Sequence, residues 1–141
     1  MFYTEAADFI KGFEGFTAVA IWDVNAYRLG YGSDTITTDL EGTFRKVKQG
    51  DITTKELATI DLARRIKTEY EPRIKTQLGE ITYNQLPDSA KIALLSLAYN
   101  YGSIPKRAII NAAKSLDMVK LKDAIVTSTC LLYTSPSPRD K

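Results

Sequence analysis

Two carboxylate residues, Glu14 and Asp23, stand nine positions apart near the start of this sequence. The 141 residues include no histidine. The chain therefore has no Ser-His or Cys-His pair for nucleophilic catalysis, and no imidazole for zinc binding or proton transfer. Any bond cleavage would have to use carboxylates, hydroxyls or lysines. Because paired carboxylates are the catalytic groups of most glycoside hydrolases, cleavage of a glycosidic bond is the first chemistry that this pair suggests.

The segment before Glu14 predicts a short helix. Thr4 is a candidate N-cap. Gly15 is a candidate for the residue just past the helix, which puts Glu14 in the last helical turn. A carboxylate there opposes the helix dipole, which would raise its pKa toward the range that a general acid needs. The expected apolar face of this helix consists of Ala6, Phe9, Ile10 and Phe13.

A β-hairpin is expected directly after this helix. Residues 17–23 are rich in β-forming side chains, and residues 27–31 resume the alternation after a turn. Asp23 would then lie at the end of the first strand. Residues 35–38 and 43–47 are candidates for two more short strands.

The sequence from Thr53 onward predicts helices. Thr53 and Glu56 have the spacing of a capping box, and Pro72 should kink or restart the helix that follows. Between Asp88 and Gly102 the apolar residues fall on nearly every side, which is typical of a helix in the centre of a core. We therefore expect an α+β protein that is predominantly α, with a small β-hairpin subdomain near the N-terminus and a helical lobe.

The bulk composition is that of an ordinary globular domain, with 44% hydrophobic and 26% charged residues. The net charge is +2. Residues 1–50 carry five basic and seven acidic side chains, and residues 51–141 carry fourteen and ten. A basic half would suit an anionic polymer such as a bacterial cell wall, although charge alone favours ordinary solvated faces. A nucleic-acid-binding protein is supported by this basic half and by nothing else.

The sequence also gives expectations about the compartment. Cys130 is the single cysteine, so no internal disulfide can form. The N-terminal residues lack the basic start and apolar run of a secretion signal. No apolar run approaches the ~20 residues that span a membrane. We expect a chain made in the cytosol, which another factor must release if its substrate lies outside the membrane.

The end of the sequence differs in character from the rest. From Cys130 it has no period and becomes rich in Ser and Pro, similar to a peptide translated from sequencing-adapter DNA. We expect one domain at residues 1–127, whose last helix runs from Asp117 to about Val126. Residues 128–141 would be a non-native or disordered tail, with the natural C-terminus missing from near Thr127.

Two segments resemble the phage-type, T4-like lysozymes, a family of endolysins. The first reads Phe13-Glu14-Gly15-Phe16, then Asp23, then Leu29-Gly30-Tyr31-Gly32. The second, Leu94 to Gly102, is similar to the family's central helix and its end, which borders the substrate cleft. The order of elements also fits, so the resemblance covers about residues 2–126.

This resemblance implies a monomeric peptidoglycan hydrolase that uses no metal or cofactor and cleaves the β-1,4 bond between N-acetylmuramic acid and N-acetylglucosamine. Glu14 would be the general acid, and Asp23 would stabilise the cationic transition state and help place the water. Such an enzyme would act as a free endolysin, held in the host cytoplasm before release, or as a virion-associated lysin. The candidate substrate-binding residues are Arg28, Tyr31, Ser33, Thr35, Tyr99 and Asn100.

The sequence departs from the family pattern where the attacking water is held. The family commonly has a threonine where this chain has Arg28, and a histidine where it has Ser33. Ser33 or Thr35 could hold the water instead. Alternatively the sugar's own 6-hydroxyl attacks, which would make the protein a lytic transglycosylase with one catalytic glutamate. A third alternative is an inactive lysozyme-fold module that binds the wall.

Overall fold

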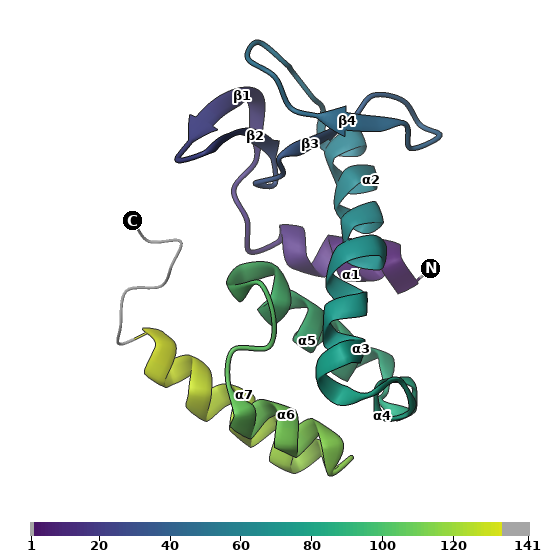
Figure 1. Ribbon diagram of the computed structural model, residues 1–141, viewed down its shortest axis with the longest axis vertical. Helices are drawn as coiled ribbons and strands as arrows, with labels where there is room; N and C mark the ends of the chain where they lie inside the picture. Colours follow the sequence, from purple (N-terminus) through teal and green to yellow (C-terminus); the bar gives the residue numbers. More distant parts are fainter. Residues whose placement is uncertain (1, 134–141) are drawn as a thin grey trace. The chain divides into compact units, whose positions relative to one another are not determined.

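The computed structural model describes residues 2–133 (Figure 1). The chain divides into two compact units, residues 1–68 and residues 69–141. The protein is α+β with helices predominating, as the sequence predicts. The elements of the first unit are α1 (Phe2–Lys11), β1 (Thr17–Asp23), β2 (Ala26–Gly30), β3 (Thr35–Thr37), β4 (Phe44–Lys46) and α2 (Lys55–Arg65). A π-helical segment (Ile66–Tyr70) follows, and then α3 (Glu71–Leu78), α4 (Glu80–Gln85), α5 (Asp88–Tyr101), α6 (Arg107–Lys114) and α7 (Met118–Tyr133).

The first unit contains two small antiparallel sheets. β1 pairs with β2, with Trp22 opposite Tyr27 and a register irregularity nearer the start of β1. β3 pairs with β4, so both predicted pairs of strands are present. A buried apolar cluster of Leu29, Ile36 and Val47 lies beneath them. The hairpin predicted from alternation is confirmed, because its inward side chains supply one wall of this cluster.

Helix α2 packs close against β2 at Gly30. This glycine has a φ of +62°, and a Cβ added to it would lie 3.0 Å from the Cβ of Ala58. Both the left-handed backbone and the close approach of the helix require a residue without a side chain. Glycine at position 30 thus allows α2 to lie close against β2.

Helix α1 differs from the predicted first helix in its bounds and its buried face. It begins at Phe2, so Thr4 lies inside the helix and does not cap it. The residues that it buries are Ala6, Ala7 and Ile10. Phe9 and Phe13 are instead 46% and 69% exposed, and their rings contact edge to face. The predicted apolar face was wrong at these two positions: Phe13 lies past the end of the helix, whereas Phe9 lies within it on an exposed side.

Helix α2 begins at Lys55, one residue later than the predicted capping box implies. Thr54 is the N-cap, and its hydroxyl accepts a hydrogen bond from the backbone N–H of Leu57. Thr53 instead donates its backbone N–H to the carbonyl of Ala18, at the edge of β1. The capping role moves by one residue because the sheet uses the backbone of Thr53.

The second unit is built around α5. Leu94, Leu95 and Ala98 are fully buried, which confirms the prediction of a central core helix. Its N-cap is Pro87, so Asp88 is the first helical residue and not the cap. Pro72 lies in the first turn of α3, where the sequence predicts either a kink or the start of a new helix.

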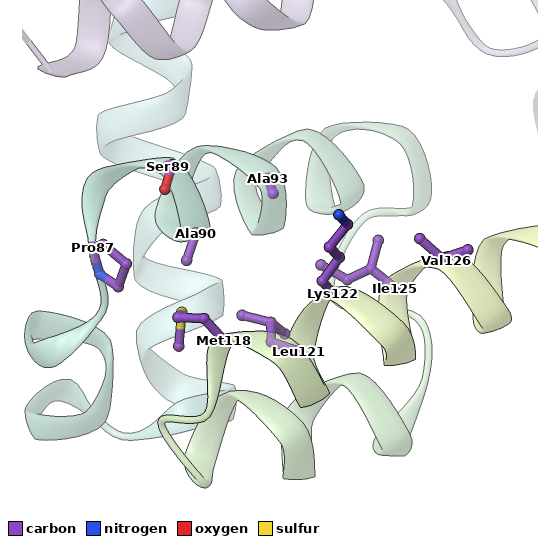
Figure 2. A pocket seen from close by; sticks show the side chains of 9 residues that line it. All are labelled: Pro87, Ser89, Ala90, Ala93, Met118, Leu121, Lys122, Ile125 and Val126. Atoms are coloured by element: carbon purple, nitrogen blue, oxygen red, sulfur yellow. The ribbon is translucent and has the colours of Figure 1, made fainter.

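Helix α7 extends further than the predicted helix, and its backbone remains helical through residues 128–133. These residues were expected to lie outside the domain, whereas residues 134–141 lie outside the described part of the chain. An apolar cavity of about 290 Å³ lies between α5 and α7 (Figure 2). Its walls include Ala90 and Ala93 from α5 and Met118 and Leu121 from α7.

Candidate active site

Glu14 lies beyond the end of α1 and not in its last turn, so the predicted position was wrong. The helix loosens into three-residue turns, in which Gly12, Phe13 and Glu14 each donate a backbone N–H to the carbonyl three residues earlier. Gly12 has low helix propensity, which accounts for the early end. The field of a helix dipole falls off within the last turn, so the dipole of α1 has little effect on Glu14. Its side chain is half-buried.

Asp23 is the last residue of β1 and faces Ala26 across the hairpin. Its side chain is 61% exposed. The two turn residues are Val24 and Asn25, and the N–H of Asn25 donates to the carbonyl of Asp23 at 2.6 Å. Val24 has a φ of +58°, which is rare for a β-branched residue. The candidate transition-state stabiliser therefore stands beside a strained turn.

Arg28 links Asp23 to the next turn of the chain. Its Nε lies 3.4 Å from Oδ2 of Asp23, and its Nη1 donates to the carbonyl of Gly32 at 3.3 Å. The guanidinium is planar and holds its donors in a fixed geometry. Arg28 can therefore orient the carboxylate of Asp23 with respect to the β2–β3 connection.

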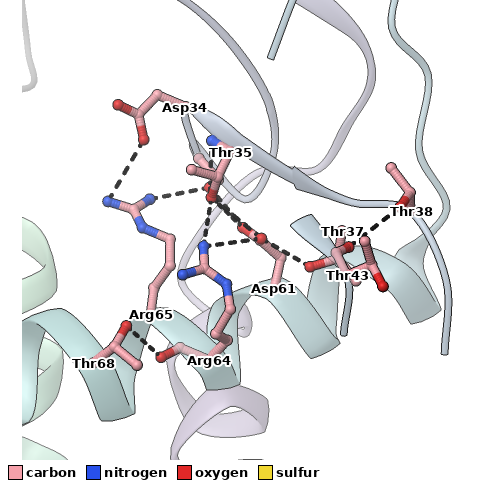
Figure 3. A network of polar contacts seen from close by, with 10 residues as sticks. Asp34, Thr35, Thr37, Thr38, Thr43, Asp61, Arg64, Arg65 and Thr68 are labelled. Atoms are coloured by element: carbon pink, nitrogen blue, oxygen red, sulfur yellow. Dashed lines mark hydrogen bonds and ion pairs between the residues drawn. The ribbon is translucent and has the colours of Figure 1, made fainter. Parts of the chain in front are cut away.

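Ser33 and Thr35 direct their hydroxyls into a polar network around Asp61 of α2. Figure 3 shows Thr35, Asp61 and the two arginines of this network. The Ser33 hydroxyl donates to Asp61 at 2.7 Å, and it accepts from the backbone N–H of Thr35 and from Nη1 of Arg65. The Thr35 hydroxyl accepts from Arg64 at 2.8 Å and contacts both Asp61 oxygens. A hydroxyl has one donor and two acceptor sites. These partners fill the capacity of Ser33, so neither its geometry nor that of Thr35 favours the water-holding role that the sequence suggested.

Three residues of this network were not singled out from the sequence: Asp61, Arg64 and Arg65. They lie at i, i+3 and i+4 on α2, and so share one helix face. Thr35 and Thr37 lie on one face of β3, and Thr37 also donates to Asp61, at 2.9 Å. The helical spacing of one acidic and two basic side chains was the only sequence signal for this network. Nothing in the local sequence indicates that these side chains contact Ser33, 28 positions before Asp61.

The remaining candidate residues are aromatic or lie in the second unit. Tyr31 is 7% exposed, and its ring centroid lies 5.4 Å from that of Phe16. Tyr99 is 8% exposed and stacks at a tilt on Tyr70. Asn100 is half-buried, and its side-chain amide donates to the carbonyl of Ser96. Burial of the two tyrosines indicates that packing is their main contribution.

Among residues 2–133, no group of three His, Cys, Asp or Glu side chains is placed to bind a metal ion. Within the same part of the chain, none of the helices combines the length and the apolar character needed to cross a bilayer.

The fold is that of a lysozyme-like protein. It has a carboxylate just beyond a short N-terminal helix, a hairpin with a second carboxylate at its end, and a helical second unit. The family model described as phage lysozyme matches residues 11–127. Because this match covers most of the sequence and includes Glu14 and Asp23, the chain belongs to the phage lysozyme family. No curated protein matches the chain. Membership of this family implies a glycosidase-type enzyme that acts on peptidoglycan.

Proposed function

We propose that this protein hydrolyses the β-1,4 bond between N-acetylmuramic acid and N-acetylglucosamine in peptidoglycan, as a free endolysin or a virion-borne lysin. The observation that carries this proposal is the placement of two carboxylates by the same small unit. Glu14 is half-buried after α1, whereas Asp23 is exposed at the end of β1. Different environments for two carboxyl groups are what an acid and an ionised partner require.

In this proposal Glu14 donates its proton to the oxygen of the departing sugar. Asp23 remains ionised and stabilises the positive charge that develops on the sugar ring. The ion pair with Arg28 supports this role, since the guanidinium holds the Asp23 carboxylate in place at the tip of the hairpin. Asn100, at the end of α5, is the proposed contact for an N-acetyl group.

A second candidate reaction is favoured by one specific observation. Arg28 stands where the family commonly has a threonine that holds the water. The Ser33 and Thr35 hydroxyls are hydrogen-bonded to Asp61. If no side chain holds the attacking water, the 6-hydroxyl of the muramic acid can attack the same carbon. The product is then a 1,6-anhydro sugar, and the enzyme is a lytic transglycosylase that needs Glu14 alone.

Digestion of purified peptidoglycan followed by mass spectrometry tests the proposal. Hydrolysis leaves reducing muramic ends, whereas the second candidate leaves predominantly anhydro-muropeptides. Glu14→Gln should abolish either product while leaving the circular dichroism spectrum unchanged. Glu5→Gln makes the same chemical change on an exposed position of α1 and should retain activity.

The alternative of an inactive wall-binding module predicts a different result. Such a protein would bind permeabilised Gram-negative cells without reducing the turbidity of their suspension. The enzymatic proposal would be refuted if the unmodified protein bound the cells without clearing their suspension and released no muropeptides from peptidoglycan.

A further inference from the structure

We infer that Asp61, acting through Ser33, is a positioning residue for the carboxylate of Asp23. The inference rests on the proposed function, because it is the proposed reaction that gives the orientation of Asp23 its importance. Asp61 lies on α2 and Asp23 at the tip of the β1–β2 hairpin, and both belong to the first unit. Three consecutive sets of contacts connect them.

The first contact anchors Ser33 to the helix. Asp61 is only 2% exposed, and its Oδ2 accepts the Ser33 hydroxyl at 2.7 Å. A hydrogen bond to an ionised, buried acceptor is stronger than one between neutral groups. Arg65 donates to the same hydroxyl at 3.1 Å, so Ser33 is held from two positions on α2.

The second set of contacts holds the turn between β2 and β3. The N–H of Ser33 donates to the carbonyl of Leu29 at 2.9 Å, and the N–H of Leu29 donates back to the carbonyl of Ser33 at 3.0 Å. Gly32, inside this turn, has a φ of +88°. Because both ends of the turn are hydrogen-bonded, fixing Ser33 also fixes the direction of the Gly32 carbonyl.

The third set of contacts passes through Arg28. Its Nη1 donates to the Gly32 carbonyl at 3.3 Å, and its Nε lies 3.4 Å from Oδ2 of Asp23. These nitrogens belong to one rigid guanidinium, so a fixed Gly32 carbonyl restricts where the Nε can point.

Such restriction matters because the Arg28–Asp23 pair is partly solvated. The Asp23 side chain is 61% exposed and that of Arg28 is 32% exposed. Exposed ion pairs contribute little on their own, since ordering two side chains offsets the Coulomb attraction. Anchoring one side of the guanidinium in advance removes part of that ordering cost. We therefore expect the anchor to affect the turnover rate more than substrate binding.

A matched pair of variants separates this role from simple stability. Ser33→Ala removes the hydrogen bond that ties the turn containing Gly32 to Asp61. Thr37→Val removes a different hydrogen bond to the carboxylate of Asp61. Thr37 is buried, and it donates at 2.9 Å to the other oxygen, Oδ1. Both variants should lower the unfolding temperature. We expect Ser33→Ala to lower kcat roughly 3- to 10-fold with little change in KM, the equivalent of about one hydrogen bond. Thr37→Val should leave kcat within about twofold.

A double-mutant cycle with Arg28→Ala identifies the route of the effect. If Ser33 acts through Arg28, then Ser33→Ala should have no further effect on kcat once Arg28 is absent. Equal kcat values for Ser33→Ala and Thr37→Val, a kcat raised by Ser33→Ala, or additive effects in the cycle would each overturn the inference. An unmodified protein that releases no muropeptides would instead refute the proposed function, so the two failures can be told apart.

Discussion

The Nε of Arg28 lies 3.4 Å from the Oδ2 of Asp23, on the neighbouring strand of the hairpin. Arg28 faces Ile21 in the strand register, so its side chain reaches along the hairpin toward the tip to make this contact. Asp34, the other acid near it in sequence, lies instead 4.0 Å from Arg65. Arg28 therefore contacts the second carboxylate of the candidate site.

Replacing Arg28 tests the value of this contact. We expect Arg28→Ala to lower kcat about tenfold, which corresponds to about 1.4 kcal/mol of lost transition-state stabilisation. Arg28→Lys keeps the positive charge but has one nitrogen, so it cannot contact Asp23 and Gly32 in the same way, and its kcat should be intermediate. Steady-state rates on solubilised peptidoglycan provide the measurement. Full activity in Arg28→Ala would show that Asp23 needs no orienting group.

The hairpin turn should be open to stabilisation. Val24 has a φ of +58° and is 88% exposed, so its side chain contributes strain and little burial. Asparagine tolerates this backbone region better than a β-branched residue. We expect Val24→Asn to raise the free energy of unfolding by about 1 kcal/mol, measured by urea denaturation. Val19→Asn, at an exposed position of β1 where φ is not positive, should give no such gain.

The buried carboxylate of Asp61 should be far more important for stability than an exposed one. Asp61→Asn removes the charge that Arg64 and three hydroxyls face, and we expect a loss of about 3–5 kcal/mol. Asp88→Asn is the matched control, since the Asp88 side chain is 69% exposed and its partner Lys91 lies 3.9 Å away. Its effect should be within about 0.5 kcal/mol. Similar unfolding midpoints for the two variants would argue against a structural role for the network.

The Arg45–Asp51 pair should make stability depend on acid pH. The hydrogen bond from Arg45, followed by the backbone N–H of Lys48, lowers the pKa of Asp51 from 3.8 to about 2. A folded-state pKa below the unfolded value stabilises the protein above that unfolded value, and the stabilisation is lost as the pH falls through the folded pKa. The contribution of Asp51 should thus be complete above about pH 4 and decline toward pH 2.

Arg45→Ala tests this pH dependence. The variant should raise the pKa of Asp51, as followed by NMR titration of its carboxyl group. Its stability deficit relative to the unmodified protein should shrink as the pH falls below about 4. A deficit that stays constant between pH 2 and pH 6 would contradict the proposed linkage.

Local patterns in the sequence were sufficient for several elements. The β-forming side chains of residues 17–23, followed by a turn and by alternation over residues 27–31, predict the hairpin. The apolar segment from Asp88 to Gly102 predicts a core helix, since a helix buried on all sides has no polar face. These predictions depend on neighbours in the chain, and the structure agrees with them.

The end of the first helix shows where local patterns fail. Gly12 and Gly15 both have low helix propensity, and propensity alone does not choose which of them ends the helix. In the structure the chain leaves the helix at Lys11, so Glu14 lies three residues beyond it. The end of a helix depends on the turns that continue from it, and the spacing of apolar residues does not specify them.

The sequence by itself determined that any hydrolytic chemistry must use carboxylates, hydroxyls or lysines, because the chain contains no histidine. The tertiary structure decided that Arg28 contacts Asp23, and it brought Asp61 to Ser33 across 28 positions of the chain. Contacts of this range form when a helix packs on a sheet, and no local spacing encodes which side chains then meet.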